Sequence, residues 1–211
     1  MVIVNMNRKG IIIVVSGFSG SGKGTIMKEL TKKYEQYALS ISATTRSPRE
    51  GEENGREYFF ISTEEFEKLI DENGLIEHAK YVNNYYGTPR KYVEDKLSQG
   101  IDVILEIEIQ GALQIKEQYK DAVLLFVMPP SASELKNRLV GRGTESAEVI
   151  EKRLKRAKEE AVGIEKYDYI VVNDDLHECV EKVHEIISSA HNAPSRNIEF
   201  INDMRKQLNE L

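Results

Sequence analysis

IIIVVSGFSGSGKGT, residues 11–25, is the stretch that decides the fold of this chain. Its first five residues are branched and apolar, as in a strand that is buried on both faces. Gly17-x-x-x-x-Gly22-Lys23 follows, and apolar residues at helical spacing come after Thr25. Such a loop can surround phosphate groups with backbone N–H groups, while the helix N-terminus and a lysine add positive charge. The stretch therefore predicts a phosphate loop for a nucleoside triphosphate.

The expected triphosphate contacts are Gly17, Phe18, Ser19, Gly20, Ser21, Gly22, Lys23, Gly24 and Thr25. One position departs from the usual pattern, in which a hydroxyl residue that binds Mg²⁺ follows the lysine directly. Gly24 stands in that place and Thr25 comes one residue later, so Thr25 or a water molecule is the expected metal ligand. A turn that is merely rich in glycine and serine is the competing interpretation.

Composition narrows the class of protein. Of the 211 residues, 40% are hydrophobic and 30% are charged, which is typical of a soluble globular domain. The longest apolar run near the start has five residues, so we expect neither a signal peptide nor a membrane span. The single cysteine, Cys179, excludes an internal disulfide and is expected in the core of a cytoplasmic protein. A net charge of −6 without a long basic run argues against nucleic-acid binding.

Strand and helix patterns alternate along the chain, which predicts an α/β fold of the phosphate-loop NTPase type, with a parallel sheet flanked by helices. The expected elements include strands at 101–109, 122–128 and 169–172, a turn at 83–87 and a helix at 176–190. We predict a single domain, residues 1–211. Its parts are a core of about 10–42 and 90–190, an inserted subdomain of about 43–89, a helical lid of about 138–160 and a helical tail of about 194–211.

Local signals add detail to this outline. Ser62 with Glu65, and Ser131 with Glu134, have the spacing of a helix capping box. Three histidines recur every seven residues, at His177, His184 and His191. Seven residues of helix rise by about 10.5 Å, which is too far for two of these side chains to share one metal ion. We expect the three histidines on a solvated helix face.

Arg46-Ser47-Pro48-Arg49 is the second informative stretch. Pro48 holds Ser47 in an extended conformation, so the two arginines are expected on a loop rather than on a helix. Two guanidinium groups on one short loop suit a terminal phosphate, which accepts paired hydrogen bonds. A pair of surface salt bridges is the competing interpretation.

Taken together, the motifs resemble the guanylate kinases, which phosphorylate GMP at the expense of ATP. The resemblance covers residues from about 10 to 190 and rests on GFSGSGKGT, SATTRSPREGEENGREYFF, GLIEHAKYVNNYYGTP, LEIEIQGA, LKNRLVGRGTE and YDYIVVND, in this order. It implies a transferase of purine nucleotide metabolism in the cytoplasm. Its implied substrates are ATP and GMP, with dGMP as a further acceptor, and its implied cofactor is Mg²⁺. The oligomeric state stays open.

Carried over by position, the resemblance implies GMP-phosphate contacts at Ser42, Arg46, Arg49, Tyr58 and Tyr86, and contacts near the guanine at Glu77, Thr88, Glu106 and Glu108. Chemistry supports Glu77 independently of the family. Guanine presents N1–H and N2–H₂ side by side, and one carboxylate can accept from both. Adenine has an acceptor at N1, so a buried Glu77 would lose a hydrogen bond. Without the family, Glu77 would be interpreted as a surface acid at a strand end.

The implied catalytic residues are Lys23, Arg138, Arg142 and Arg153. Phosphoryl transfer depends on alignment and on compensation of charge, and three lid arginines suit that task. Asn173 is the implied neighbour of the adenine. Glu106 follows an apolar run at the place of the second-strand acid in phosphate-loop enzymes, so it can serve either Mg²⁺ or the guanine.

Other classes fit the sequence less well. A guanylate-kinase-like interaction module would be expected to lose the loop glycines or Lys23. A GTPase would need an Asn-Lys-x-Asp motif, which the chain lacks. A kinase for another small phosphorylated substrate is disfavoured by Glu77 and Thr88. The chain departs from the family at Phe18, at Gly24, at the glutamates of positions 106 and 108, and beyond Ala193.

Overall fold

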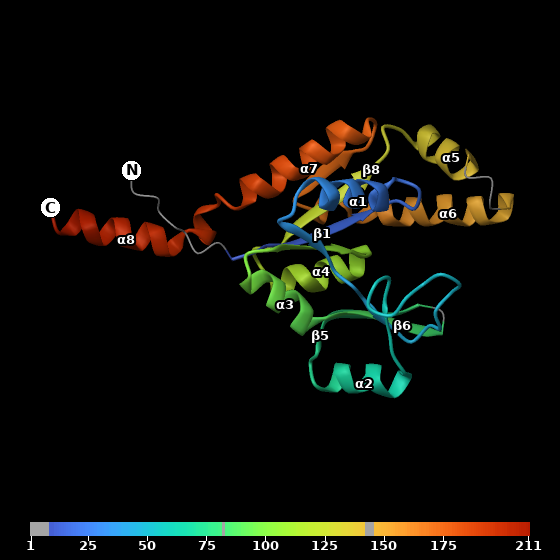
Figure 1. Cartoon of the computed structure of the whole chain (residues 1–211). Coiled ribbons are helices and arrows are strands. Elements are labelled where there is room, and N and C mark those ends of the chain that lie inside the picture. Colours follow the sequence, from blue (N-terminus) through green and yellow to red (C-terminus); the bar gives the residue numbers. More distant parts are fainter. Residues whose placement is uncertain (1–8, 82, 142–145) are drawn as a thin grey trace.

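A parallel sheet of five strands forms the centre of the computed structural model, which describes residues 9–81, 83–141 and 146–211 (Figure 1). The strand order is β2-β7-β1-β8-β9, and every pairing is parallel. The bounds are Ile12–Gly17 for β1, Tyr37–Leu39 for β2, Asp102–Glu106 for β7, Val123–Met128 for β8 and Tyr169–Val172 for β9. The predicted α/β architecture is confirmed.

Alternate side chains of β1 enter two separate cores, because successive residues of a strand point to opposite faces of the sheet. Ile13 and Val15 pack with α1 (Lys23–Lys33) and α7 (Leu176–Ala190), and Cys179 is buried in this core as expected. Ile12 and Val14 pack with α3 (Arg90–Ser98) and α4 (Ile109–Gln118) on the other face. The phosphate-loop stretch is therefore held from both sides of the sheet.

A second sheet lies between β2 and α3 in the chain and below the main sheet in Figure 1. Its strand order is β4-β3-β6-β5, with bounds Ala43–Thr44 for β3, Phe59–Phe60 for β4, Leu75–Tyr81 for β5 and Asn84–Pro89 for β6. Helix α2 (Thr63–Asp71) buries Phe66 against this sheet. Ser62 and Glu65 form the expected capping box at its start.

The turn predicted at residues 83–87 is too long: Asn83 lies in a turn, but residues 84–87 belong to a strand. Tyr85, Tyr86 and Gly87 belong to β6 and pair with β5 in antiparallel register. Two asparagines and a glycine favour a turn, but two adjacent tyrosines favour a strand, and pairing along β5 decides for the strand. This pairing also brings Thr88 directly opposite Glu77.

Two helices, α5 (Ala132–Gly141) and α6 (Ala147–Glu160), lie beside the end of β8, and a short 3-10 helix, η1 (Ala161–Lys166), follows α6 (Figure 1). Leu135, Leu139 and Ala157 pack together between them. Ser131 Oγ accepts from Glu134 N at 3.1 Å, as a helix cap does. The carboxylate of Glu134, however, accepts from Arg138 Nε at 2.8 Å, so the second predicted capping box is replaced by an ion pair along the helix.

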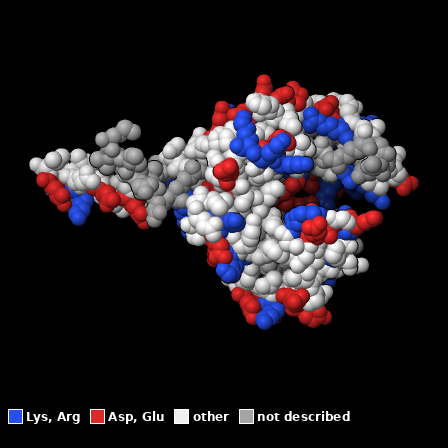
Figure 2. All heavy atoms as spheres, viewed as in Figure 1, with Lys and Arg blue, Asp and Glu red and all other residues white. Residues whose placement is uncertain are grey.

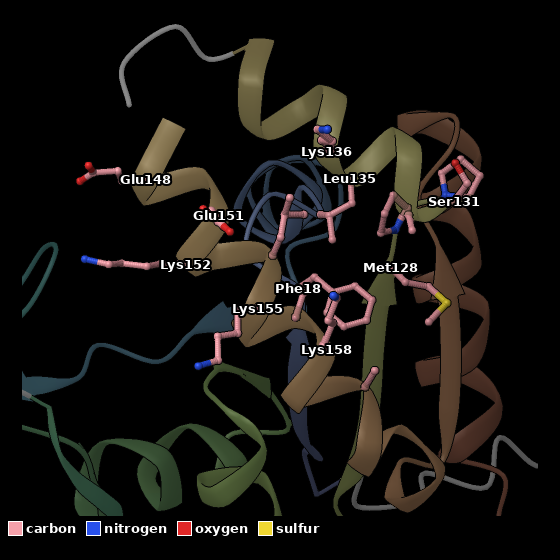
Figure 3. Close-up of a pocket in the computed structure, with 16 residues that line it drawn as sticks. Phe18, Met128, Ser131, Leu135, Lys136, Glu148, Glu151, Lys152, Lys155 and Lys158 are labelled. Carbon is pink, nitrogen blue, oxygen red and sulfur yellow. The ribbon is translucent and has the colours of Figure 1, made fainter. Parts of the chain in front are cut away.

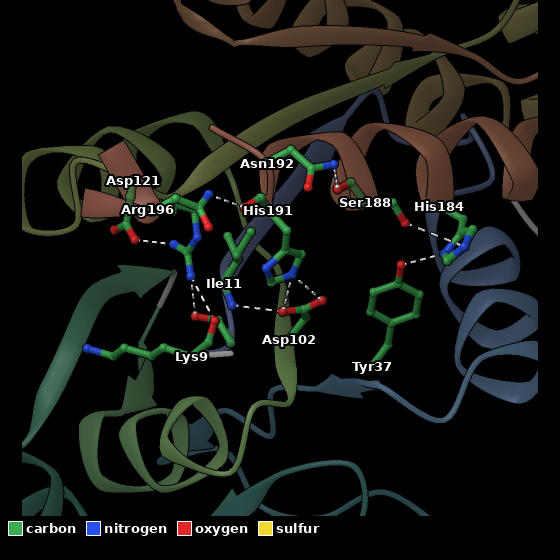
Figure 4. Close-up of polar contacts among 12 residues, drawn as sticks. Lys9, Ile11, Tyr37, Asp102, Asp121, His184, Ser188, His191, Asn192 and Arg196 are labelled. Carbon is green, nitrogen blue, oxygen red and sulfur yellow. Dashed lines mark hydrogen bonds and ion pairs between the residues drawn. The ribbon is translucent and has the colours of Figure 1, made fainter. Parts of the chain in front are cut away.

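The solvated histidine face is wrong for two of its three members. His184 stacks on Tyr34 with ring centroids 3.8 Å apart, and its Nδ1 lies 2.6 Å from Tyr37 Oη. His191 Nε2 lies 2.9 Å from Oδ1 of Asp102, a carboxylate that is fully buried and also accepts from Ile11 N (Figure 4). Asp102 is 89 residues away in sequence, so helical spacing alone could not show this contact.

The segment after α7 fastens the beginning of β1. Arg196, in the 3-10 helix η2 (Pro194–Arg196), donates to the carbonyl groups of Lys9 and Gly10 and pairs with Asp121 (Figure 4). Helix α8 (Ile198–Asn209) follows and points away from the sheet (Figure 1). The described residues contain no helix that combines the length and hydrophobicity needed to cross a membrane.

Replacing His191 by alanine should lower the free energy of unfolding by about 3 kcal/mol, because a buried carboxylate loses a hydrogen-bonding partner. Urea unfolding at neutral pH measures the change. His177→Ala is the matched control, since His177 is exposed on the same helix and should change stability by less than about 0.5 kcal/mol. Equal losses for both variants would contradict the role of the Asp102–His191 contact.

Candidate active site

The phosphate loop lies between β1 and α1, at the carboxyl edge of the main sheet. Gly22 has φ 90°, in the left-handed region that glycine adopts without strain. A Cβ on Gly22 would lie 2.4 Å from Asn173 Nδ2, and a Cβ on Gly17 would lie 2.1 Å from the Val127 carbonyl oxygen. Both positions therefore need glycine for space as well as for backbone conformation. Helix α1 begins at Lys23, two residues before Thr25, where the helical pattern of the sequence begins.

Lys23 lies across the loop that it belongs to. Its Nζ donates to the carbonyl oxygen of Gly17 at 2.7 Å and to that of Phe18 at 3.3 Å. The ammonium group is thus held at the loop, where phosphate oxygens would approach. Ser21 Oγ is buried and forms no hydrogen bond to any residue that the structure describes.

Asn173 supports the loop from behind. It is 7% exposed, and its Nδ2 donates to the Ser21 carbonyl oxygen at 2.8 Å. The backbone carbonyl oxygen of Asn173 accepts from Arg138 Nη2 at 2.9 Å. The structure therefore links Asn173 and Arg138 to the phosphate loop, while a contact between Asn173 and adenine stays a prediction.

Glu106 ends β7 beside the first turn of α1. A Cβ on Gly24 would lie 3.8 Å from Glu106 Oε2, so the carboxylate faces the place where a hydroxyl residue usually follows the lysine. Thr25 and Glu106 are both exposed. Among the described residues, no three His, Cys, Asp or Glu side chains gather as a metal site. Carboxylate, hydroxyl and water oxygens are nevertheless the ligands that Mg²⁺ prefers beside substrate phosphates.

Glu77 lies on β5 and is 7% exposed, so this predicted guanine contact is a buried carboxylate. Thr88 Oγ1 donates to Glu77 Oε1 at 2.7 Å from the neighbouring strand. Burial raises the pKa of Glu77, and the hydrogen bonds from Thr88 oppose that shift. The predicted pair of Glu77 and Thr88 is therefore brought together, with one carboxylate oxygen left to other partners.

Gly111 was not predicted as part of this site. It lies in the first turn of α4, and a Cβ on it would lie 3.1 Å from Glu77 Oε2. A larger residue would push the carboxylate away. The sequence does contain a signal, because a glycine in the first turn of a helix lowers helix stability and needs a local reason.

The loop after β3 gathers most of the predicted phosphate contacts. The guanidinium carbon of Arg46 lies 5.4 Å from the centre of the Tyr58 ring, and the Tyr58 and Tyr86 rings are 6.0 Å apart. Burial raises the pKa of Tyr58, so its hydroxyl stays protonated and able to donate. Ser42 lies just before β3, and its carbonyl accepts from Phe59 N. Arg49 is exposed, and its positive charge lies near enough to Tyr58 to oppose the rise in the pKa of that residue.

Glu52 is the residue that sequence reasoning missed in this loop. Its two carboxylate oxygens accept from the two terminal nitrogens of Arg46 at 2.9 and 3.0 Å, and its Oε2 also accepts from Arg49 N at 2.7 Å. The same contacts lower the pKa of Glu52, with the Arg46 hydrogen bonds as the main cause. The salt-bridge interpretation is therefore correct for Arg46, which is held in place by an acid beside two tyrosines.

The helices α5 and α6 carry the predicted lid arginines. Arg153 Nη1 donates to Ser19 Oγ at 3.1 Å, which joins α6 to the phosphate loop. Arg138 is held by Glu134 and by the Asn173 carbonyl. Arg142 lies outside the described residues.

Two cavities flank α6. One has a volume of about 1030 Å³ and lies between α5, α6 and the end of β8, with Phe18 and Leu135 in its wall (Figure 3). The other has a volume of about 560 Å³ and lies between α6 and the start of α4, lined by Glu108, Arg156 and Glu160 among others. In the space-filling view, a hollow opens between α6 and the second sheet (β4-β3-β6-β5), which we call the inserted sheet (Figure 2). Acidic atoms lie in its depth and basic atoms on its rim.

Comparisons with known proteins identify the family of this chain. The family model described as guanylate kinase matches residues 9–190. The chain belongs to the guanylate kinase family. A guanylate kinase of Oceanobacillus iheyensis is 53% identical over 186 residues, covering 88% of this chain and 90% of that protein. One of Caldanaerobacter subterraneus is 48% identical over 204 residues, covering 97% and 99%. Among solved structures, the guanylate kinase of Anaplasma phagocytophilum is 35% identical, with a TM-score of 0.71 and 90% of each chain covered.

Family membership makes the chain an enzyme, a kinase acting on GMP. The phosphate loop follows the main sheet, whereas Glu77, Tyr86 and Thr88 lie on the second sheet, and Arg46 and Tyr58 lie between its strands β3 and β4.

Proposed function

We propose that the enzyme binds ATP at the phosphate loop and GMP at the inserted sheet, and transfers the γ-phosphoryl group to give ADP and GDP. The observation that carries this proposal is Glu77, a buried carboxylate held by Thr88 in a chain that also contains a phosphate loop. One Glu77 oxygen already accepts from Thr88, and the pair of oxygens faces the two donors of guanine. The same acceptor edge accommodates dGMP, because it does not contact the ribose.

The donor half of the proposal rests on charge placement. Lys23 supplies the mobile positive charge for the β- and γ-phosphates, and Arg153 and Arg138 approach the loop through Ser19 and Asn173. Arg142 completes this set by the family resemblance. Three guanidinium groups compensate the charge on the transferring oxygens, which is the main requirement of phosphoryl transfer.

The acceptor half rests on Arg46 with Tyr58 and Tyr86. When GMP enters, its phosphate competes with Glu52 for the Arg46 fork, because both present paired oxygen atoms. Arg49, on the same loop as Arg46, and Ser42, just before β3, complete the phosphate contacts. Glu108 stands at the start of α4, in the same turn as Gly111, which lies beside Glu77.

Mg²⁺ fits the donor side of the cleft. Glu106 and Thr25 offer hard oxygen ligands next to the phosphate loop, and water molecules fill the other positions. The bound ion would neutralise charge on the β- and γ-phosphates. The placement of Glu106 beside Gly24 favours its role with the metal over a role with the guanine.

A coupled assay of ADP release tests the proposed function. The purified chain with ATP, Mg²⁺ and GMP should release ADP, and removal of GMP or chelation of Mg²⁺ should abolish the release. ADP release that does not depend on GMP would indicate a hydrolase and would contradict the proposal.

A further inference from the structure

Arg156 lies between two acidic side chains that belong to different parts of the cleft. Its Nε donates to Glu160 Oε1 at 3.1 Å, one turn further along α6. Its Nη2 pairs with Glu108, which precedes α4 and lies 48 residues away in sequence. One guanidinium thus joins the helix that contacts the phosphate loop to the helix that contacts the Glu77 carboxylate.

Glu108 is unusual for its position. It occupies the N-cap of α4, a position where Ser, Thr, Asp or Asn commonly accepts from backbone N–H groups of the first turn. Its side chain forms no such cap and reaches across to Arg156 instead. The ion pair between the two helices therefore replaces a local contact that this position would otherwise offer.

The far end of α4's first turn reaches the base pocket. Glu108 and Gly111 are three residues apart, so they lie on neighbouring positions of one helix face. Gly111 is the residue whose added Cβ would lie 3.1 Å from Glu77 Oε2. A shift of this turn would change the space around the Glu77 carboxylate.

The other end of the network lies on α6, the helix that Arg153 joins to the phosphate loop through Ser19. Glu160 is half-buried; burial raises its pKa, as does the negative charge of Glu108, while Arg156 and the positive charge of Lys23 oppose the shift. Phosphate groups that bind Lys23 would weaken its attraction for Glu160. The Arg156 guanidinium would then be shared differently between Glu160 and Glu108.

We infer that Arg156 is a positioning residue that couples the donor and acceptor sites, so that ATP bound at the phosphate loop tightens GMP binding through Glu108. The inference rests on the proposed function, because it needs both nucleotides to bind in this cleft. Coupling of this kind is reciprocal, so GMP must tighten ATP binding by the same factor.

Titration calorimetry of the full chain tests this inference. The dissociation constant of GMP is measured without and with a saturating non-hydrolysable ATP analogue. The coupling factor is the value without the analogue divided by the value with it. The wild-type factor should exceed one. Arg156→Ala should reduce it by about two- to fivefold, the range for an ion pair that is partly exposed. Arg156→Gln is a second variant of similar length, and Lys158→Ala, an exposed lysine of the same helix, is the matched control.

Glu108→Gln supplies the second half of a double-mutant cycle. The single variants and the double variant should show the same reduced factor, because each removes one contact. A wild-type factor of one, a factor unchanged in both Arg156 variants, or additive losses in the double variant would overturn the inference. Failure of the proposed function would look different, because the wild-type chain would then not bind GMP at all.

Discussion

Lys23→Ala should lower kcat for the transfer from ATP to GMP by at least about 10²-fold, which corresponds to about 2.7 kcal/mol of transition-state stabilisation. The ammonium group is held at the loop by the Gly17 and Phe18 carbonyls, so it is in place before the nucleotide binds. Charge on the transferring oxygens grows in the transition state, and a contact made there affects kcat more than KM.

Steady-state kinetics with ATP and GMP varied separately measure this loss. Lys28→Ala is the matched control, because Lys28 is exposed on the same helix and lies five residues after Lys23. The KM for GMP should change little in either variant. Near-normal turnover by the Lys23 variant would contradict its role as the charge that serves the phosphates.

Glu77→Gln should lower kcat/KM for GMP by about 10²-fold or more, with a much smaller effect on the apparent affinity for ATP. Glutamine presents one acceptor and one donor, so one of the two guanine donors would face an N–H group in a buried site. Thr88 would still hold the side chain in place through the remaining acceptor. The substitution thus alters the hydrogen-bonding pattern more than the shape of the pocket.

Kinetics with each nucleotide varied in turn separate the two effects. Glu64→Gln makes the same chemical change at an exposed position of α2 and should leave all constants unaltered. Equal losses for GMP and ATP would show that Glu77 holds the fold together rather than the base.

The pH dependence of kcat/KM for GMP follows from the same residue. Burial raises the pKa of Glu77, so the carboxyl group keeps its proton to a higher pH than an ordinary glutamate. A protonated carboxyl cannot accept from both guanine donors. As the pH falls through this raised pKa, kcat/KM for GMP should fall, and the acid limb should disappear in the Glu77→Gln variant.

Features that depend on neighbouring residues could be read from the sequence. The phosphate loop, the capping box of Ser62 with Glu65, strand β9 and helix α7 all follow from short patterns, and the structure agrees with them. The α/β class follows because these patterns alternate along the chain.

Features that depend on contacts between distant parts of the chain could not be predicted from the sequence. The proximity of Asp102 to His191, of Gly111 to Glu77 and of Arg156 to Glu108 joins segments that no spacing rule relates. The start of strand β6 is predicted as a turn because Asn83, Asn84 and Gly87 favour a turn, and only the pairing with β5 favours the strand. The contact of Glu52 could not be predicted, because it depends on the direction of the Arg46 guanidinium group.

The most direct measurement of the central claim is the ratio of kcat/KM for GMP to that for AMP, with ATP as donor in one coupled assay. A site in which the buried Glu77 accepts from two guanine donors should favour GMP by at least about 10⁴-fold, because AMP would leave the carboxylate without those bonds. Turnover of AMP and GMP at similar rates, or no turnover of GMP, would contradict the account.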